Sequence, residues 1–142
     1  MQRRWLPTLG ELIDRLSIHQ LKEVFVPEHK EKFSSEMKDI THDIDEFIKE
    51  NDIKLTGEML RCVIALAQIN EHIWYNENEA RQGGTQDLER LRLTHGLNGL
   101  RNRLMNKIMY LTGQSERHDP KTDCLAAEFS DWLLSILEDD NG

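Results

Sequence analysis

Cross-links and helix breakers are scarce in this sequence, which has two cysteines, three prolines and eight glycines among 142 residues. Cys62 and Cys124 cannot supply a disulfide framework, and neither belongs to a CxxC pair or a Cys/His ligand spacing. The sequence therefore predicts no metal site and no cofactor, and it favours a reducing, cytoplasmic setting. With so few breakers, we expect long helices.

Long hydrophobic runs and net positive charge are also lacking. No stretch approaches the roughly 18–20 apolar residues that a membrane span requires, and MQRRWLP lacks the apolar part of a signal peptide. The formal charge of −8 argues against a nucleic-acid binder, because binding to phosphate backbones requires a basic surface. We therefore expect a soluble protein that binds neither membranes nor nucleic acid.

The first part of the sequence predicts two amphipathic helices. Thr8 and Glu11 have the capping-box spacing, in which two side chains satisfy unpaired amides at a helix start. The first helix should end near Val26 and Pro27, because proline disfavours helix in the residue before it. The second should cover about 28–50, where apolar residues repeat at helical spacing: Phe33, Met37, Ile40, Ile44, Phe47 and Ile48.

The rest of the sequence predicts a long helical hairpin. Thr56 is a candidate cap for a third helix that runs to the Gly83-Gly84 pair, and a fourth would extend from about Thr85 to Thr112, before Gly113. A polar linker is expected at 115–123, then a last amphipathic helix, and a frayed acidic tail at 138–142. The prediction is one all-α domain over 1–142, an up-down bundle of about five helices.

The predicted fourth helix carries two stripes on nearly opposite faces. Leucines form an apolar stripe that predicts a buried face: Leu93, Leu97, Leu100 and Leu104. His95, Asn98 and Asn102 form a polar stripe. If the chain folds back about Gly83-Gly84, residues whose numbers total 168 face each other, and Asn70 then lies opposite Asn98 in a coiled-coil-like seam.

Two interpretations of this polar seam stay open. A buried asparagine pair commonly fixes the register of two helices and requires no ligand. Alternatively, the seam binds a small polar ligand such as a nucleotide or nucleotide sugar, because charged residues share the side of Asn70, where an unpaired charge would be costly. The candidate ligand-binding residues are Asn70, Glu77, Arg81, His95, Asn98, Arg101 and Asn102.

No complete catalytic motif is found, so no catalytic residue is predicted and the sequence favours a protein that is not an enzyme. Asp39 and His42 lack the second Glu-x-x-His motif of di-metal bundles, and Gly83-Gly84 lacks the Lys-Ser or Lys-Thr of a phosphate-binding loop. The leading interpretation is an interaction or accessory module that forms a homodimer. Gly96 and Gly99 would allow another backbone to approach closely at the dimer contact.

Three segments carry a resemblance: LGELIDRLSI at 9–18, WYNENEAR at 74–81 and LNGLRNRLMNKI at 97–108. Together they resemble a group of small helical proteins of unknown function from phages and bacteria, some encoded near glycosyltransferases, with the pattern LGELIDRLSI, an acidic Glu…Arg segment and LNxxRNxLIDEID. Acidic positions of the last piece are Asn106, Lys107 and Met109 here. The resemblance therefore implies a helical bundle and an accessory role, without an acidic metal site.

Overall fold

The protein is an all-α bundle in the residues that the structure describes. The computed structural model describes residues 6–83, 88–114 and 135–138, with side chains described except at 80–83 and 138. The elements are α1 (Leu9–Phe25), the 3₁₀ turn η1 (Pro27–His29), α2 (Lys30–Glu50), α3 (Gly57–Gly83), α4 (Leu88–Leu111) and α5 (Ser135–Glu138). These ranges contain five α-helices and no strand, so the predicted fold class is confirmed.

The helix ends form where the sequence signals place them. The Glu11 amide donates to Thr8 Oγ1 at 3.1 Å and the Thr8 amide donates to Glu11 Oε1 at 3.2 Å, which completes the predicted capping box. At the start of α3 the Met59 amide donates to Thr56 Oγ1 at 3.2 Å. Beyond α4, Gly113 has φ +74°, the left-handed backbone that favours glycine. Local side-chain chemistry therefore sets these boundaries.

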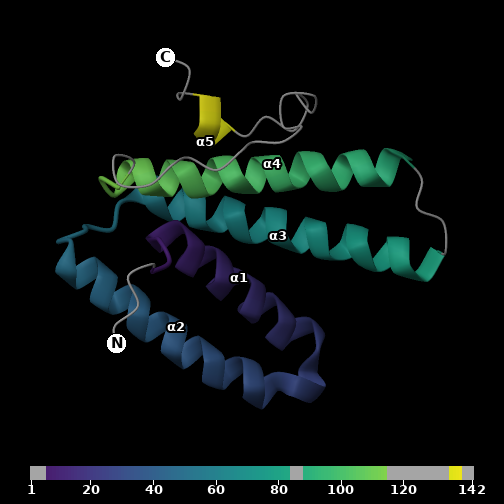
Figure 1. Ribbon diagram of the computed structural model, residues 1–142, viewed down its shortest axis with the longest axis horizontal. Coiled ribbons are helices and arrows are strands. Elements are labelled where there is room, and N and C mark those ends of the chain that lie inside the picture. Colours follow the sequence, from purple (N-terminus) through teal and green to yellow (C-terminus); the bar gives the residue numbers. More distant parts are fainter. Residues whose placement is uncertain (1–5, 84–87, 115–134, 139–142) are drawn as a thin grey trace.

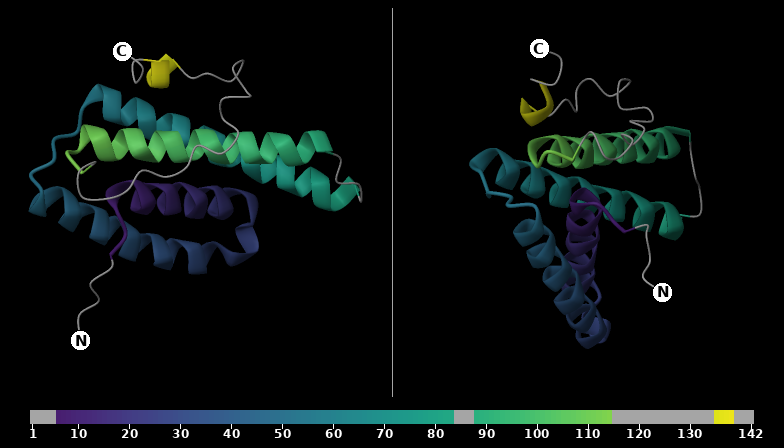
Figure 2. Two further views of the ribbon diagram at one scale, coloured as in Figure 1. Left: turned by 45° about the horizontal axis from the view of Figure 1, so that its top comes forward. Right: turned by 60° about the vertical axis from the view of Figure 1, so that its left-hand side comes forward.

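Two antiparallel hairpins, α1–α2 and α3–α4, make up the bundle (Figure 1). α1 packs against α2, α3 and α4, so it joins the hairpins, whereas α2 packs mainly on α1. Figure 2 shows the α1–α2 hairpin on one side of the α3–α4 hairpin. The approach of α1 to α4 is close at Gly10, where a Cβ would lie 3.1 Å from the Met105 carbonyl oxygen. α2 is thus the outermost of the four long helices.

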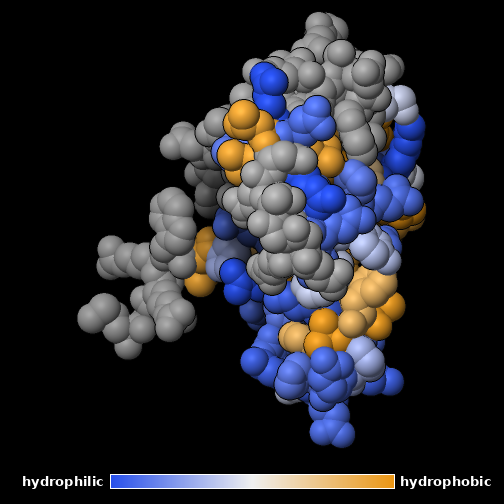
Figure 3. Space-filling model, turned by 90° about the vertical axis from the view of Figure 1, so that its right-hand side faces the viewer, coloured by the Kyte–Doolittle hydropathy of each residue, from blue (hydrophilic) through white to orange (hydrophobic). Residues whose placement is uncertain are grey.

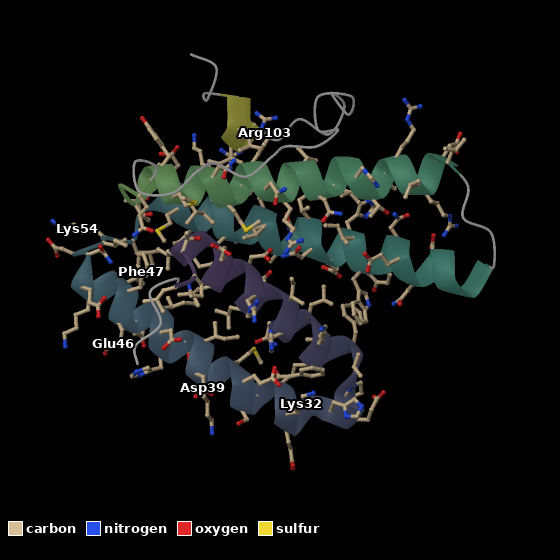
Figure 4. All side chains as sticks on the ribbon, viewed as in Figure 1. Lys32, Asp39, Glu46, Phe47, Lys54 and Arg103 are labelled. Carbon is tan, nitrogen blue, oxygen red and sulfur yellow. The ribbon has the colours of Figure 1, made fainter. Side chains whose placement is uncertain are left out.

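The core lies between α1, α3 and α4. Its fully buried side chains come from these helices and from α5: Leu9, Cys62, Leu66, Leu97, Leu100, Leu104, Ile108 and Leu137. α2 contributes Ile40 as its one buried residue, and the rest of its predicted apolar stripe is half-buried. Charged side chains such as Lys32, Asp39 and Glu46 lie along the outer side of α2 (Figure 4). The bundle therefore leaves α2 only partly covered.

The α3–α4 hairpin has a register that agrees with the prediction. Asn76, which is 8% exposed, donates through its side-chain amide to the Arg90 carbonyl at 3.3 Å and to Thr94 Oγ1 at 2.6 Å. These two contacts place Asn76 opposite Arg92, as the predicted pairing requires. The leucine stripe of α4 is buried apart from Leu93, which is half-buried.

Several predictions concern residues outside the described ranges. The linker at 115–123, most of the last predicted helix, the tail beyond 138 and the turn at 84–87 belong to these segments. Among the described helices, none combines the length and the apolar character that crossing a membrane would need.

Candidate functional site

A buried ion pair between α1 and α4 is the centre of the candidate site. Arg101 Nε donates to Asp14 Oδ1 at 2.8 Å, and Arg101 Nη2 donates to Asp14 Oδ2, so the guanidinium binds the carboxylate in a bidentate manner. The Asp14 side chain is 8% exposed and that of Arg101 is 29% exposed. Hydrogen bonding to Asp14 outweighs the effect of burial and raises the pKa of Arg101. The guanidinium therefore keeps its charge, and two hydrogen bonds fix its orientation on the carboxylate.

Asn70 of α3 extends this ion pair into a network that joins three helices. Its side-chain amide donates to Asp14 Oδ1 at 2.9 Å and to Ser17 Oγ at 2.7 Å, and the residue is 6% exposed. Ser17 Oγ in turn donates to the Asp14 carbonyl at 2.8 Å. Asp14 thus accepts three side-chain hydrogen bonds. A carboxylate so occupied holds helices in place, and it would have to leave the network to act as a base.

Asn70 and Asn98 do not bond to each other, so the predicted asparagine pair does not form, although the register that places them opposite each other is correct. Both hydrogens of the Asn70 amide go to α1, and Asn98 Oδ1 accepts from Arg101 Nη1 at 3.4 Å. The two asparagines are therefore linked through Asp14 and Arg101. The physical reason is that a carboxylate is a stronger acceptor than a neutral amide oxygen, so it draws the Asn70 donors toward α1.

Four of the seven predicted site residues line one cavity of about 370 Å³, which we call the polar pocket. They are Asn70, Glu77, Asn98 and Arg101, and the other lining residues are Ile18, Leu21, Lys22, Ile73, Trp74 and Asn78. His95 is exposed and Asn102 is half-buried, and neither lines this cavity. The Arg81 side chain lies outside the described residues. The structure therefore brings four of the predicted residues together in one pocket and leaves His95 and Asn102 outside it.

The polar pocket has no ready-made metal site. Searching the described part of the chain finds no group of three or more His, Cys, Asp or Glu side chains placed to hold a metal ion. The lining groups are mostly carboxamides and apolar side chains, with Glu77 as the carboxylate of the lining. Such a lining can accept and donate hydrogen bonds to a ligand and pack against its faces.

Sequence reasoning missed the two residues of α1 that organise the network, Asp14 and Ser17. A signal was present, because Asp14 and Ser17 share a helix face with Gly10 and Leu21 at spacings of three and four residues. A carboxylate on the same side as a buried leucine requires a partner. That partner could not be identified from α1 alone, because Arg101 lies 87 residues further along the chain.

A larger cavity of about 720 Å³, which we call the apolar groove, lies between α1, α2 and α3. α1 forms its floor from Ile13 to Phe25, α2 contributes Met37 to one wall, and α3 contributes Val63 to the other. Two apolar residues of the floor reach the surface, because Val24 is 63% exposed and Phe25 is 39% exposed. Figure 3, which faces the end where α1 turns into α2, shows apolar surface in its lower part beside hydrophilic surface.

No protein-family model, curated protein or solved structure matches the chain. The resemblance to small helical proteins of phages and bacteria therefore stays a prediction.

Proposed function

We propose that the protein is a self-associating interaction module, a homodimer in which α2 of each copy lies in the apolar groove of the other. The observation that carries this proposal is the groove itself. A groove lined by apolar side chains and open to water is a candidate binding surface. Val24 and Phe25 are the most exposed of the apolar side chains that line it.

The dimensions of the groove suit a helix. Its floor extends from Ile13 to Phe25, which corresponds to a length of about 18 Å along α1. A volume of about 720 Å³ over that length gives a cross-section of about 40 Å². A helix with its side chains is roughly 10–12 Å across, so this cross-section is close to half of a helix. The groove thus accommodates the apolar side of one helix laid along it.

α2 is the helix of this chain that has most to gain from a partner. It packs mainly on α1, and Ile40 is its single buried residue. Its half-buried Met37 lines the groove. In a two-fold symmetric dimer the same surface serves both copies, so inserting each α2 into the other groove covers both helices at once.

The charges on the two walls of the groove are complementary under this symmetry. Lys38 lies on the α2 wall and Glu71 on the α3 wall, and neither makes an ion pair with another described residue. Lys38 and Glu71 lie at about the same position along α1. Glu36, two residues before Lys38, bonds to His19 of α1, and Asn70, next to Glu71, bonds to Ser17 of α1. When the two-fold axis runs between the two α2 helices and parallel to them, α2 of each copy lies over the α1 floor of the other, and Lys38 is then level with Glu71 on the partner's α3 wall.

The dimer surface predicted from the sequence is different. Gly96 and Gly99 of α4 are both buried, so they offer no open face to a second copy. This correction moves the proposed contact from α4 to the groove between α1, α2 and α3.

A charge-exchange experiment tests this dimer. Light scattering should give a mass of twice 16.7 kDa for the wild-type chain. Lys38→Glu and Glu71→Lys should each weaken dimerisation by about 1–2 kcal/mol, roughly 5–30-fold, because two attractive pairs become repulsive. The double variant K38E/E71K should restore the wild-type mass. Lys32→Glu, on the outer side of α2, is the matched control and should change nothing.

Two results would contradict the proposal. A wild-type mass of 16.7 kDa at about 100 µM would show that the chain does not self-associate in the relevant range. A dimer that is unaffected by either single charge reversal would show that it forms through another surface.

A further inference from the structure

The network around Asp14 determines which hydrogen-bonding groups Asn70 and Asn98 can offer to a ligand in the polar pocket. Asn70 uses both amide hydrogens on Asp14 and Ser17, so what it can offer a ligand is its carbonyl oxygen, an acceptor. Asn98 turns its carbonyl oxygen toward Arg101, so what it can offer is its amide group, a donor. The pocket therefore presents an acceptor and a donor that are both anchored to the same ion pair.

Part of the remaining lining of the polar pocket is apolar. Ile18, Leu21 and Ile73 line it together with the Trp74 side chain. A planar ring can pack against such side chains while its edge forms hydrogen bonds, and base–aromatic stacking combined with edge recognition is how proteins hold single nucleobases. Asn98 and Asn70 together offer the donor and the acceptor that such recognition uses.

From this arrangement we infer that the polar pocket is a binding site for the base of an uncharged nucleoside. The ring lies among Trp74 and the aliphatic side chains, and its edge accepts from Asn98 and donates to Asn70. Asn78 and Glu77 make no hydrogen bond with other described residues, so both are available to the ribose hydroxyls. A volume of about 370 Å³ lies within the roughly 300–1,000 Å³ of small-molecule sites.

The charges of the pocket favour a nucleoside over a nucleotide. The Arg101 guanidinium is already paired with Asp14, and Glu77 adds a negative charge. Lys22 has its Nζ 6.0 Å from the centre of the Phe33 ring on α2. A phosphate would therefore meet the Glu77 carboxylate and a guanidinium that already bonds to Asp14, which disfavours it relative to an uncharged group. This inference is independent of the proposed dimer, because the groove and its two charged walls are not required for it.

Side-chain NMR signals of the full-length chain provide the test. We would titrate ¹⁵N-labelled protein with adenosine, guanosine, cytidine and uridine, and in parallel with adenosine monophosphate, ribose and glucose. At least one nucleoside should shift the side-chain amides of Asn70 and Asn98 and the Trp74 indole in a saturable manner. Adenosine monophosphate should bind more weakly than adenosine, and ribose and glucose should leave the signals unchanged.

Variants separate the pocket from general destabilisation. Asn98→Ala and Trp74→Leu should each weaken nucleoside binding by about tenfold or more while the backbone spectrum stays that of a folded protein. Gln68→Ala, which removes an exposed carboxamide from α3, is the matched control and should leave binding unchanged. The inference is overturned if no nucleoside at about 5 mM shifts the pocket signals, if the monophosphate binds at least as tightly, or if only the sugars bind.

Discussion

Different sides of α1 bury a charged residue and expose an apolar one, although apolar residues are usually the buried ones. One side carries Asp14, a charged residue, and buries it against α3 and α4. Toward the groove α1 carries Val24, which is apolar and stays largely exposed. Burial in this bundle is therefore decided by which faces another helix covers. Polarity decides only whether the covered groups need partners, and the Asp14 carboxylate has two, Arg101 and Asn70.

The contrast also separates stability from specificity. A buried ion pair adds little net stability over apolar residues of similar volume, because desolvation offsets the attraction. However, an arrangement that leaves one of the two charges buried without its partner is strongly destabilised. We therefore interpret the Asp14 network as the device that orients α1 on α3 and α4, while apolar packing among residues such as Leu66 and Leu104 supplies most of the stabilisation.

Removing the carboxylate from the buried side of α1 should have the largest effect. Asp14→Ala leaves the Arg101 guanidinium and the Asn70 amide without their acceptor, and should lower the free energy of unfolding by about 3 kcal/mol. Urea denaturation measures this loss. Asp39→Ala, on the outer side of α2, is the control and should cost less than about 0.5 kcal/mol.

The same network supplies a stricter test of this interpretation. The double variant Asp14→Leu with Arg101→Met should recover much of the lost stability, because it removes both charges instead of stranding one. If Asp14→Ala cost no more than Asp39→Ala, the buried network would have no structural role and the contrast between the sides of α1 would fail.

A smaller loss is expected in the seam between α3 and α4. Asn76→Ala removes two hydrogen bonds, to the Arg90 carbonyl and to Thr94 Oγ1, and should cost about 1–2 kcal/mol by thermal or urea unfolding. Because Thr94 Oγ1 also donates to the Arg90 carbonyl, Asn76→Ala and Thr94→Ala should be non-additive. Strictly additive losses would mean that the three groups do not act as one unit.

The smallest change in stability is expected on the open side of α1. Val24→Ser replaces an apolar residue that is 63% exposed, so it should alter the free energy of unfolding of dilute, monomeric protein by about 0.5 kcal/mol or less. At higher concentration the same substitution should weaken self-association, as measured by light scattering. A large loss of monomer stability would instead place Val24 in the core and remove the basis for an open groove.

The sequence by itself determined the features that depend on neighbours along the chain. The Thr8–Glu11 capping box and the Thr56 cap could be predicted because each contact joins residues three positions apart. The positive φ of Gly113 follows from helix-ending chemistry at a single position. The hairpin register was also accessible, because one turn at a known place relates every residue of α3 to its partner in α4.

Only the tertiary structure decided which groups meet across helices. The spacing of polar residues brought Asn70, Glu77, Asn98 and Arg101 into one predicted site, but it could not show that Asn70 would bond to Asp14 instead of Asn98. That choice depends on how α1 crosses the α3–α4 hairpin, a geometry set by packing at contacts such as Gly10 on Met105. The apolar groove has the same origin, because periodicity marks which face of a helix is apolar but does not say whether another helix covers it.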